Sequence, residues 1–149
     1  MNNSKRQILL VEDNPDDVEL IQVALAELNM PHEVIYLTDG QQAIDYVLGR
    51  DEFADHPKLE NPAIIILDLK LPKIAGFEIL KLIRANPHTM HAPVVIFTSS
   101  NIQADISMGY QLGANSIITK PTESKLFADC VKLVGSYWLL WNHPFPGTK

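Results

Sequence analysis

Five polar side chains in this sequence follow short apolar runs, and their chemical types suit the transfer of a phosphoryl group. They are three carboxylates, one hydroxyl and one ammonium, contributed by Glu12, Asp13, Asp68, Thr98 and Lys120. Carboxylates that lie close together repel one another unless a cation neutralises them, and Mg²⁺ is a hard divalent ion that such groups hold. We therefore expect Asp68 to accept the phosphoryl group. Mg²⁺ and Lys120 would neutralise its oxygens, and the Thr98 hydroxyl would donate a hydrogen bond to one of them.

Each of these residues has a simpler explanation when it is taken alone. An acidic residue after a strand is more often a helix cap or a solvated loop residue. Thr98 alone suits a turn, and Lys120 alone suits a solvent-exposed charge. The functional interpretation depends on the whole set, because chance would rarely place a suitable residue at the ends of four different apolar runs.

The apolar runs are short and alternate with longer amphipathic stretches, so we expect strands that alternate with helices. The runs cover residues 8–11, 34–37, 63–67, 94–97 and 117–119. Five such units predict an α/β fold of the flavodoxin-like class, a doubly wound (βα)5 parallel sheet of order 2-1-3-4-5 with helices on both faces. The carboxyl ends of parallel strands meet at one edge of the sheet, which would bring the five side chains together.

Capping residues mark the ends of two of the expected helices. Asn14 and Pro15 suit the cap and the first residue of the first helix, and Asp16 and Asp17 suit its first turn, where acidic side chains favour the helix dipole. Gly113 suits the end of the fourth helix, because glycine readily adopts the left-handed conformation found there.

Composition limits the possible classes of protein. The chain has 149 residues, 46% of them hydrophobic and 20% charged, which predicts a single globular domain over 1–149. A net charge of −6 disfavours binding to nucleic acid. Cys130 is the only cysteine, so no internal disulfide forms. The run 8–11 is too short for a signal sequence or a membrane span, so we expect a cytoplasmic protein that does not enter a membrane.

Four short motifs resemble those of the receiver domains of bacterial response regulators in two-component signalling. They are the segments LVEDN at 10–14, DLKLP at 68–72 with Gly76 after it, FTS at 97–99 and TKP at 119–121. The resemblance covers about residues 7–137. It implies that Asp68 is the phosphoacceptor, that Thr98 is the switch hydroxyl and that Lys120 pairs with the phosphoryl group.

The same resemblance implies a set of metal ligands. The carboxylates of Asp13 and Asp68 and the backbone carbonyl of Lys70 would hold Mg²⁺ directly, and Glu12 would act through water. The small side chain of Ser99 would leave the phosphoryl pocket open.

Three features depart from the pattern of the family. Ile117 stands three residues before Lys120, where receivers often have an aromatic switch residue, so the switch must use another rearrangement. Lys70 follows the acceptor by two residues, where its side chain could overhang the site and change the lifetime of the phosphoryl group. The connection 49–61 is longer than usual, and we expect a solvated surface loop there.

The last residues, 137–149, are predicted to form an aromatic and proline-rich extension. Tyr137, Trp138 and Trp141 continue the fifth helix past the expected receiver core, and Phe145 follows between two prolines. We expect an association surface, most simply a symmetric homodimer, with a tail folded back on its own domain as the alternative. These features resemble the small regulators that partner cyanobacterial phytochrome histidine kinases.

The leading hypothesis is a phosphorylation-controlled regulator, not an enzyme, that takes its phosphoryl group from a sensor histidine kinase. With no output domain expected, it would signal by associating with other proteins. A constitutive interaction or dimerisation module with little phosphorylation switching is the alternative. A phosphatase of the haloacid dehalogenase type is disfavoured, because it needs a second aspartate where Lys70 stands. Nucleotide or flavin binding is disfavoured because no glycine-rich loop follows the first strand.

Overall fold

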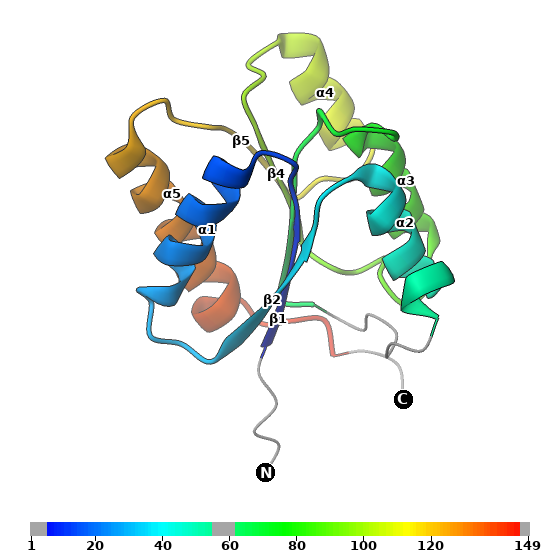
Figure 1. Ribbon diagram of the computed structural model, residues 1–149, viewed down its shortest axis with the longest axis horizontal. Helices are drawn as coiled ribbons and strands as arrows, with labels where there is room; N and C mark the ends of the chain where they lie inside the picture. Colours follow the sequence, from blue (N-terminus) through cyan, green and yellow to red (C-terminus); the bar gives the residue numbers. More distant parts are fainter. Residues whose placement is uncertain (1–5, 55–61, 147–149) are drawn as a thin grey trace.

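Five parallel strands form the centre of the computed structural model, which describes residues 6–54 and 62–146 (Figure 1). The strand order is β2-β1-β3-β4-β5, which confirms the expected flavodoxin-like sheet. The strands are β1 Arg6–Val11, β2 His32–Leu37, β3 Ile64–Leu67, β4 Val94–Thr98 and β5 Ser116–Thr119. The helices are α1 Pro15–Ala26, α2 Gly40–Leu48, α3 Gly76–Ala85, α4 Gln103–Gln111 and α5 Ser124–Ser136.

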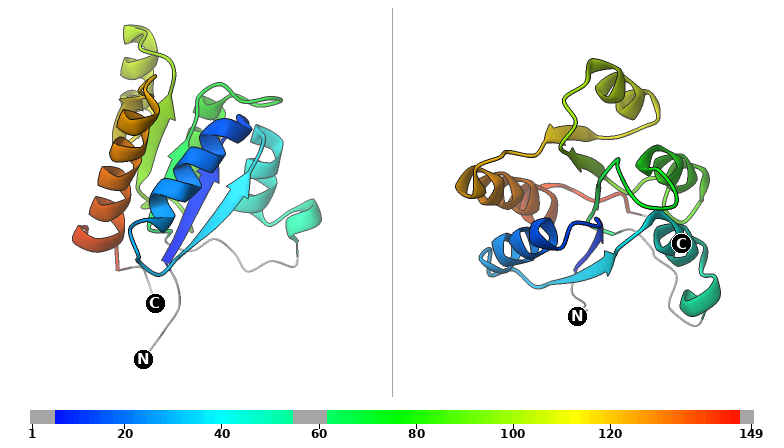
Figure 2. Two further views of the ribbon diagram at one scale, coloured as in Figure 1. Left: turned by 60° about the vertical axis from the view of Figure 1, so that its left-hand side comes forward. Right: turned by 45° about the horizontal axis from the view of Figure 1, so that its top comes forward.

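Helices cover both faces of the sheet (Figure 2). Helices α1 and α5 pack on one face, while α2 and α3 pack on the other, with α4 beside β5. Alternate residues of β1 divide between the two cores: Ile8 and Leu10 face α1 and α5, whereas Leu9 and Val11 face α2 and α3. This burial on both faces explains the continuous apolar runs of the sequence. Each fully buried aliphatic side chain of this kind stabilises the fold by roughly 1.5–3 kcal/mol.

Helix α1 begins as its sequence predicts. Pro15 is its first residue, and the Asn14 side chain accepts hydrogen bonds from the backbone N–H groups of Asp16 and Asp17 at 2.9 and 3.2 Å. The cap therefore fixes the direction in which the first turn of α1 leaves β1. Gly113 follows α4 with a φ of +104°, which confirms the expected glycine stop.

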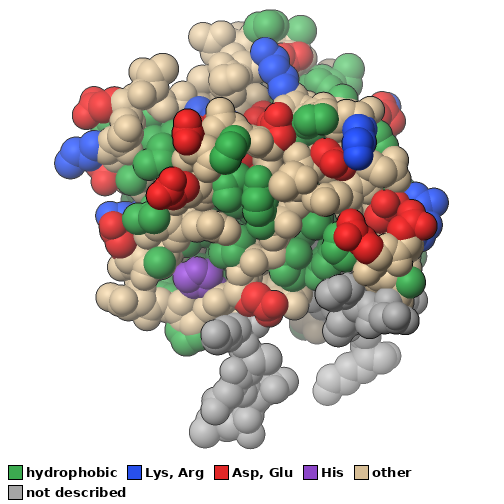
Figure 3. Space-filling model, viewed as in Figure 1, with side chains coloured by type: hydrophobic (Ala, Val, Ile, Leu, Met, Phe, Trp, Pro, Cys, Tyr) green, Lys and Arg blue, Asp and Glu red, His purple; other side chains and the backbone are tan. Residues whose placement is uncertain are grey.

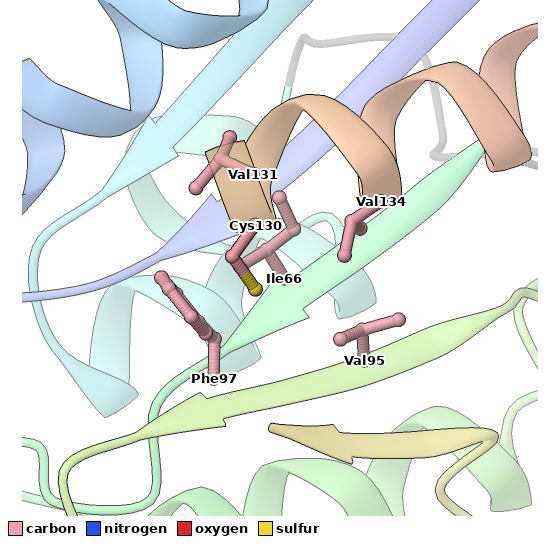
Figure 4. Close-up of a pocket in the computed structure, with 6 residues that line it drawn as sticks. All are labelled: Ile66, Val95, Phe97, Cys130, Val131 and Val134. Carbon is pink, nitrogen blue, oxygen red and sulfur yellow. The ribbon is translucent and has the colours of Figure 1, made fainter. Parts of the chain in front are cut away.

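A small apolar cavity lies between α5 and the sheet (Figure 4). Its lining residues are Ile66, Val95, Phe97, Cys130, Val131 and Val134. The sulfur of Cys130 lies among these apolar side chains, and burial raises the pKa of its thiol. Cys130 therefore acts as a small packing residue.

The long connection after α2 is more ordered at its start than expected. Residues Asp51–Phe53 form a 3-10 turn, and the Phe53 ring packs edge-on against Tyr46 with a centroid separation of 5.2 Å. The expectation of a solvated loop is therefore wrong at Phe53, which joins the core under α2. The rest of that expectation, at 55–61, lies outside the described residues.

The end of α5 changes its helical geometry. Residues Tyr137–Trp141 form a π-helical turn that continues α5, and the Arg6 guanidinium donates a hydrogen bond to the Leu139 carbonyl at 3.0 Å. Leu139 is buried by this turn. Among the described residues, no helix combines the length and the apolar character needed to cross a membrane.

Candidate functional site

The acidic side chains meet at the carboxyl ends of β1 and β3. Parallel pairing aligns Val11 with Leu67, so the residues that follow them, Glu12 and Asp68, stand side by side. One carboxylate oxygen from each of Glu12, Asp13 and Asp68 lies within 4.8 Å of the others. Glu12 and Asp68 are buried, whereas Asp13 is exposed. Three clustered carboxylates with one side open to solvent suit a hard divalent cation that keeps part of its water shell. The structure therefore brings together the three carboxylates that the sequence predicts for a divalent-cation site, and their role as ligands stays a prediction.

Lys120 crosses from the end of β5 into this cluster. Its ammonium donates hydrogen bonds to Glu12, to Asp17 Oδ2 at 2.8 Å and to Asp68 Oδ2 at 3.1 Å. Its side chain is only 9% exposed. An ammonium has three protons, so these three carboxylates occupy all of its donors.

Burial and neighbouring charges shift the pKa values of Glu12 and Lys120. Burial raises the pKa of Glu12 to about 7. The hydrogen bond from Lys120 lowers this pKa, whereas repulsion from the charge of Asp68 raises it further. Burial alone would lower the pKa of Lys120, but hydrogen bonds to Asp17 and Glu12 and the charge of Asp68 outweigh it and raise that pKa. Lys120 therefore stays protonated and supplies a fixed positive charge beside Asp68.

Thr98 ends β4 next to this cluster. The pairing of Leu67 with Ile96 places Asp68 and Thr98 at neighbouring strand ends, and Thr98 is 1% exposed. Its hydroxyl oxygen accepts a hydrogen bond from the Ser100 N–H at 3.3 Å. The Ser100 hydroxyl in turn donates to Asp105 Oδ2 in α4 at 2.7 Å. A chain of contacts therefore joins the Thr98 hydroxyl to the first turn of α4.

The loop after Asp68 closes tightly on its own backbone. The N–H of Lys70 donates to Asp68 Oδ1 at 3.3 Å, and the N–H of Gly76 donates to the Leu69 carbonyl at 3.0 Å. The exposed side chain of Lys70 forms no ion pair within the described part of the chain. The role of the Lys70 carbonyl as a metal ligand stays a prediction.

Ile117, at the predicted switch position, is a residue of β5, and its side chain packs against α4. It is partly buried and packs against the core, and a Cβ atom built on Gly109 would lie 2.5 Å from its Cδ1 atom. Ile117 thus fills the space that the absent side chain of Gly109 leaves open. Its role in switching stays a prediction.

Asp17 is the site residue that the sequence analysis missed. The helix dipole alone accounts for its position, because it favours an acidic residue in the first turn of any helix. The available signal was its spacing of three residues from the Asn14 cap. That spacing places its side chain over the same strand ends, but the contact with Lys120 depends on how α1 packs on the sheet.

The predicted interface residues lie at the opposite end of the sheet (Figure 1). Tyr137 and Trp141 are 49% and 71% exposed. Trp138 instead packs against the core formed by α1 and α5, and Phe145 stacks on His91 with a centroid separation of 3.8 Å. The Tyr137 ring meets Trp138 edge-on with a centroid separation of 4.9 Å, and Trp141 is the most exposed of the four aromatic side chains.

Basic side chains are scattered over the face shown in Figure 3, separated by acidic and neutral ones. The molecule carries 12 basic and 18 acidic residues in all. That face offers no continuous basic track of the kind that follows a phosphate backbone.

A comparison with protein families matches residues 8–132 to the response regulator receiver domain. Among curated proteins, the chain is 36% identical over 138 residues to the response regulator Rcp1 of Synechocystis sp.. That alignment covers 93% of this chain and 92% of Rcp1.

Solved structures give the same result at the level of the fold. The phosphorylated cyanobacterial phytochrome response regulator RcpA superposes with a TM-score of 0.88 at 37% identity, covering 95% of this chain and 99% of that one. The Mn²⁺-bound form of Rcp1 superposes with a TM-score of 0.87 at 35% identity, covering 94% and 99%. Both similarities extend past the family match into the C-terminal part of the chain.

Proposed function

The chain belongs to the response regulator receiver domain family of two-component signalling, and we propose that its Asp68 accepts a phosphoryl group from the phosphohistidine of a sensor kinase. One observation carries the proposal. The buried Asp68 carboxylate accepts a hydrogen bond from the Lys120 ammonium at 3.1 Å and lies in one cluster with the carboxylates of Glu12 and Asp13. This arrangement gives one carboxylate a cationic partner and a place beside a metal site.

The proposed reaction is a displacement at phosphorus. A carboxylate oxygen of Asp68 attacks, an O–P bond forms, the P–N bond to the kinase imidazole breaks, and the electron pair of that bond returns to the imidazole nitrogen. Lys120 neutralises charge on the phosphoryl oxygens, and the Thr98 hydroxyl turns from Ser100 to donate to one of them. Hydrolysis by water breaks the Asp68 O–P bond, releases inorganic phosphate and restores the carboxylate.

The carboxylates of Asp13 and Asp68, with Glu12 and the Lys70 carbonyl, would hold Mg²⁺. The ion supplies positive charge that offsets the phosphoryl oxygens. The burial of Glu12 and Asp68 next to the exposed Asp13 supports this assignment, since one side of the cluster is open to solvent and to an incoming group. The Mn²⁺-bound form of Rcp1 is a related receiver that holds a divalent ion.

We infer that the signal leaves the site through α4 and β5. When Thr98 turns toward the phosphoryl group, Ser100 loses its acceptor, and Ser100 is bonded to Asp105 of α4. Ile117 packs on the same helix at Gly109. A shift of α4 relative to the Ile117 side chain would then take the place of the movement of the aromatic switch side chain in other receivers.

The proposed partners are a phytochrome-type histidine kinase and a second copy of this chain. Similarity to the phytochrome response regulator RcpA supports the first. An apolar surface at the end of α5 supports the second, since Leu133, Tyr137, Leu140 and Trp141 are between 49% and 72% exposed. Residues 137–149 would then extend the single receiver domain as part of a dimer contact.

Constitutive association is the second candidate function. The end of α5, where the exposed aromatic residues are, and the carboxyl end of β1 lie at opposite ends of the sheet (Figure 1), which favours a contact that does not depend on phosphorylation. Sedimentation with and without beryllofluoride separates the two candidates. An unchanged mass together with an unchanged affinity for the kinase would support the constitutive module.

Labelling with radioactive acetyl phosphate tests the main proposal. We expect the wild-type protein to take up label in the presence of Mg²⁺ and to take up little when the metal is chelated before acetyl phosphate is added. The Asp68→Asn variant should take up none, because an amide is a poor nucleophile. Equal labelling of the variant would overturn the proposal.

A further inference from the structure

Asp17 forms an ion pair that the proposed reaction does not use. Its carboxylate accepts a hydrogen bond from Lys120 at 2.8 Å, a shorter contact than the 3.1 Å between Lys120 and Asp68. It lies outside the group of carboxylates, Glu12, Asp13 and Asp68, that are close enough to share a metal ion. A metal in that group would therefore leave the Asp17 carboxylate to Lys120 alone.

The position of Asp17 is fixed by the start of α1. The Asn14 cap holds the N–H of Asp17 at 3.2 Å, and the next residue, Val18, is buried in the core. The neighbouring Asp16 has the same cap contact at 2.9 Å, but it is exposed and forms no ion pair within the described residues. Two aspartates of the same turn thus differ in their burial and in the contact with Lys120.

The three donors of Lys120 are all occupied, so a phosphoryl group must replace one or more of their acceptors. Phosphorylation turns Asp68 into an acyl phosphate, and its hydrogen bond passes to a phosphoryl oxygen. Asp17 would retain a second donor, and its negative charge would offset part of the positive charge that Lys120 presents to the phosphoryl group.

The Asp17–Lys120 pair borders a groove open to solvent. Ser99, Thr122 and Ser124 line the same groove between α1 and the start of α5, and the Asp17 side chain is 22% exposed. Water can therefore replace Lys120 as the partner of Asp17 at small cost, which makes the exchange of acceptors feasible.

We propose that Asp17 is a positioning residue that competes with the phosphoryl oxygens for Lys120 and so weakens the hold on the phosphoryl group. This inference rests on the proposed function of Asp68. It names a residue outside the metal cluster that sets the lifetime of the phosphorylated state.

The first test compares Asp17→Asn with its matched control, Asp16→Asn. Both substitutions remove one negative charge from the first turn of α1, so their effects on the helix dipole are the same. We expect Asp17→Asn to bind beryllofluoride about fivefold more tightly and to keep its aspartyl phosphate about fivefold longer. An effect of this size is typical for the loss of a partly exposed ion pair. Asp16→Asn should match the wild-type protein in both measurements.

A double-mutant cycle with Lys120→Gln separates competition from a general effect of charge. In the Lys120→Gln background we expect Asp17→Asn to leave beryllofluoride affinity unchanged, because the residue acts through Lys120. Weaker or unchanged binding by Asp17→Asn alone would overturn the inference, as would an equal gain in the Lys120→Gln background. A wild-type protein that takes up no label would instead overturn the proposed function.

Discussion

The backbone of Gly76 lies against the carbonyl oxygen of Asp68, so closely that a Cβ atom on Gly76 would be 2.3 Å from it. The second nearest atom to this Cβ position, 2.8 Å away, is the Cα atom of Leu69. Both neighbours are backbone atoms, so the space for a methyl group cannot be made by moving a flexible side chain. The glycine eight residues after the phosphoacceptor therefore lets α3 begin directly beside the site.

Gly76→Ala should lower both stability and phosphorylation. We expect a loss of about 1–3 kcal/mol in the free energy of unfolding, because the backbone of the site must move to admit a methyl group. Urea unfolding and labelling by acetyl phosphate measure the two effects.

Gly49→Ala is the control for this prediction. Gly49 has a φ of +66° and open space around its Cα, so an added methyl group strains the backbone without a clash. It should cost about 1 kcal/mol of stability and leave the phosphorylation rate unchanged. A normal rate for Gly76→Ala would contradict the assigned role of the close contact.

The stability of the metal-free protein should fall as the pH rises. Burial raises the pKa of Glu12 from 4.5 to about 7, so between these values the folded protein keeps a proton that the unfolded chain has released. The stability due to this difference is complete below pH 4.5 and is lost as the pH rises through 7.

Glu12→Gln should remove this loss. At pH 8 we expect the free energy of unfolding, measured with urea, to be about 1–3 kcal/mol higher for the variant than for the wild-type protein. This difference should become smaller as the pH is lowered. Glu19→Gln makes the same change on the exposed face of α1 and should have little effect. A constant gap at all pH values would contradict the raised pKa.

Asp13→Asn should weaken the binding of Mg²⁺. The variant removes one of three clustered carboxylates, and we expect a loss of about tenfold or more in affinity. Calorimetric titration with MgCl₂ measures this, with Asp16→Asn as a control outside the cluster. Equal affinity in the two variants would show that the ion binds elsewhere.

Trp141→Ser should reduce self-association without unfolding the chain. The side chain is 71% exposed, so its loss should change stability by about 0.5 kcal/mol or less. Val23→Ser, on an exposed position of α1, is the matched control for lost apolar area. Sedimentation equilibrium should show a weaker dimer for Trp141→Ser only; a dimer equally strong in both variants would place the contact on another surface.

The strands and the five polar residues at or after their ends could be predicted because both depend on local sequence pattern. Strands buried on both faces have continuous apolar sequences, and a parallel sheet brings their ends to one edge. The contacts of Arg84 could not be predicted in this way. Its guanidinium donates hydrogen bonds to the carbonyls of Met90, Ala92 and Gly113. These contacts form only after α3 has packed beside β4 and α4.

The aromatic residues at the end of α5 show a second limit. Regular α-helical spacing would place Trp138 and Trp141 on one side of the helix. The π-helical turn Tyr137–Trp141 changes that phase, so Trp138 packs on the core while Trp141 faces outward. A widened turn has no reliable sequence signal, and the direction of each side chain therefore needed the structure.

Locating the phosphoryl group on the chain shows whether Asp68 is the phosphoacceptor. The protein is phosphorylated by acetyl phosphate with Mg²⁺, treated with sodium borohydride to reduce the acyl phosphate, and mapped by peptide mass spectrometry. We expect homoserine in place of Asp68 and unmodified Glu12, Asp13 and Asp17. Modification of another carboxylate, with Asp68 intact in a phosphorylated protein, would contradict it.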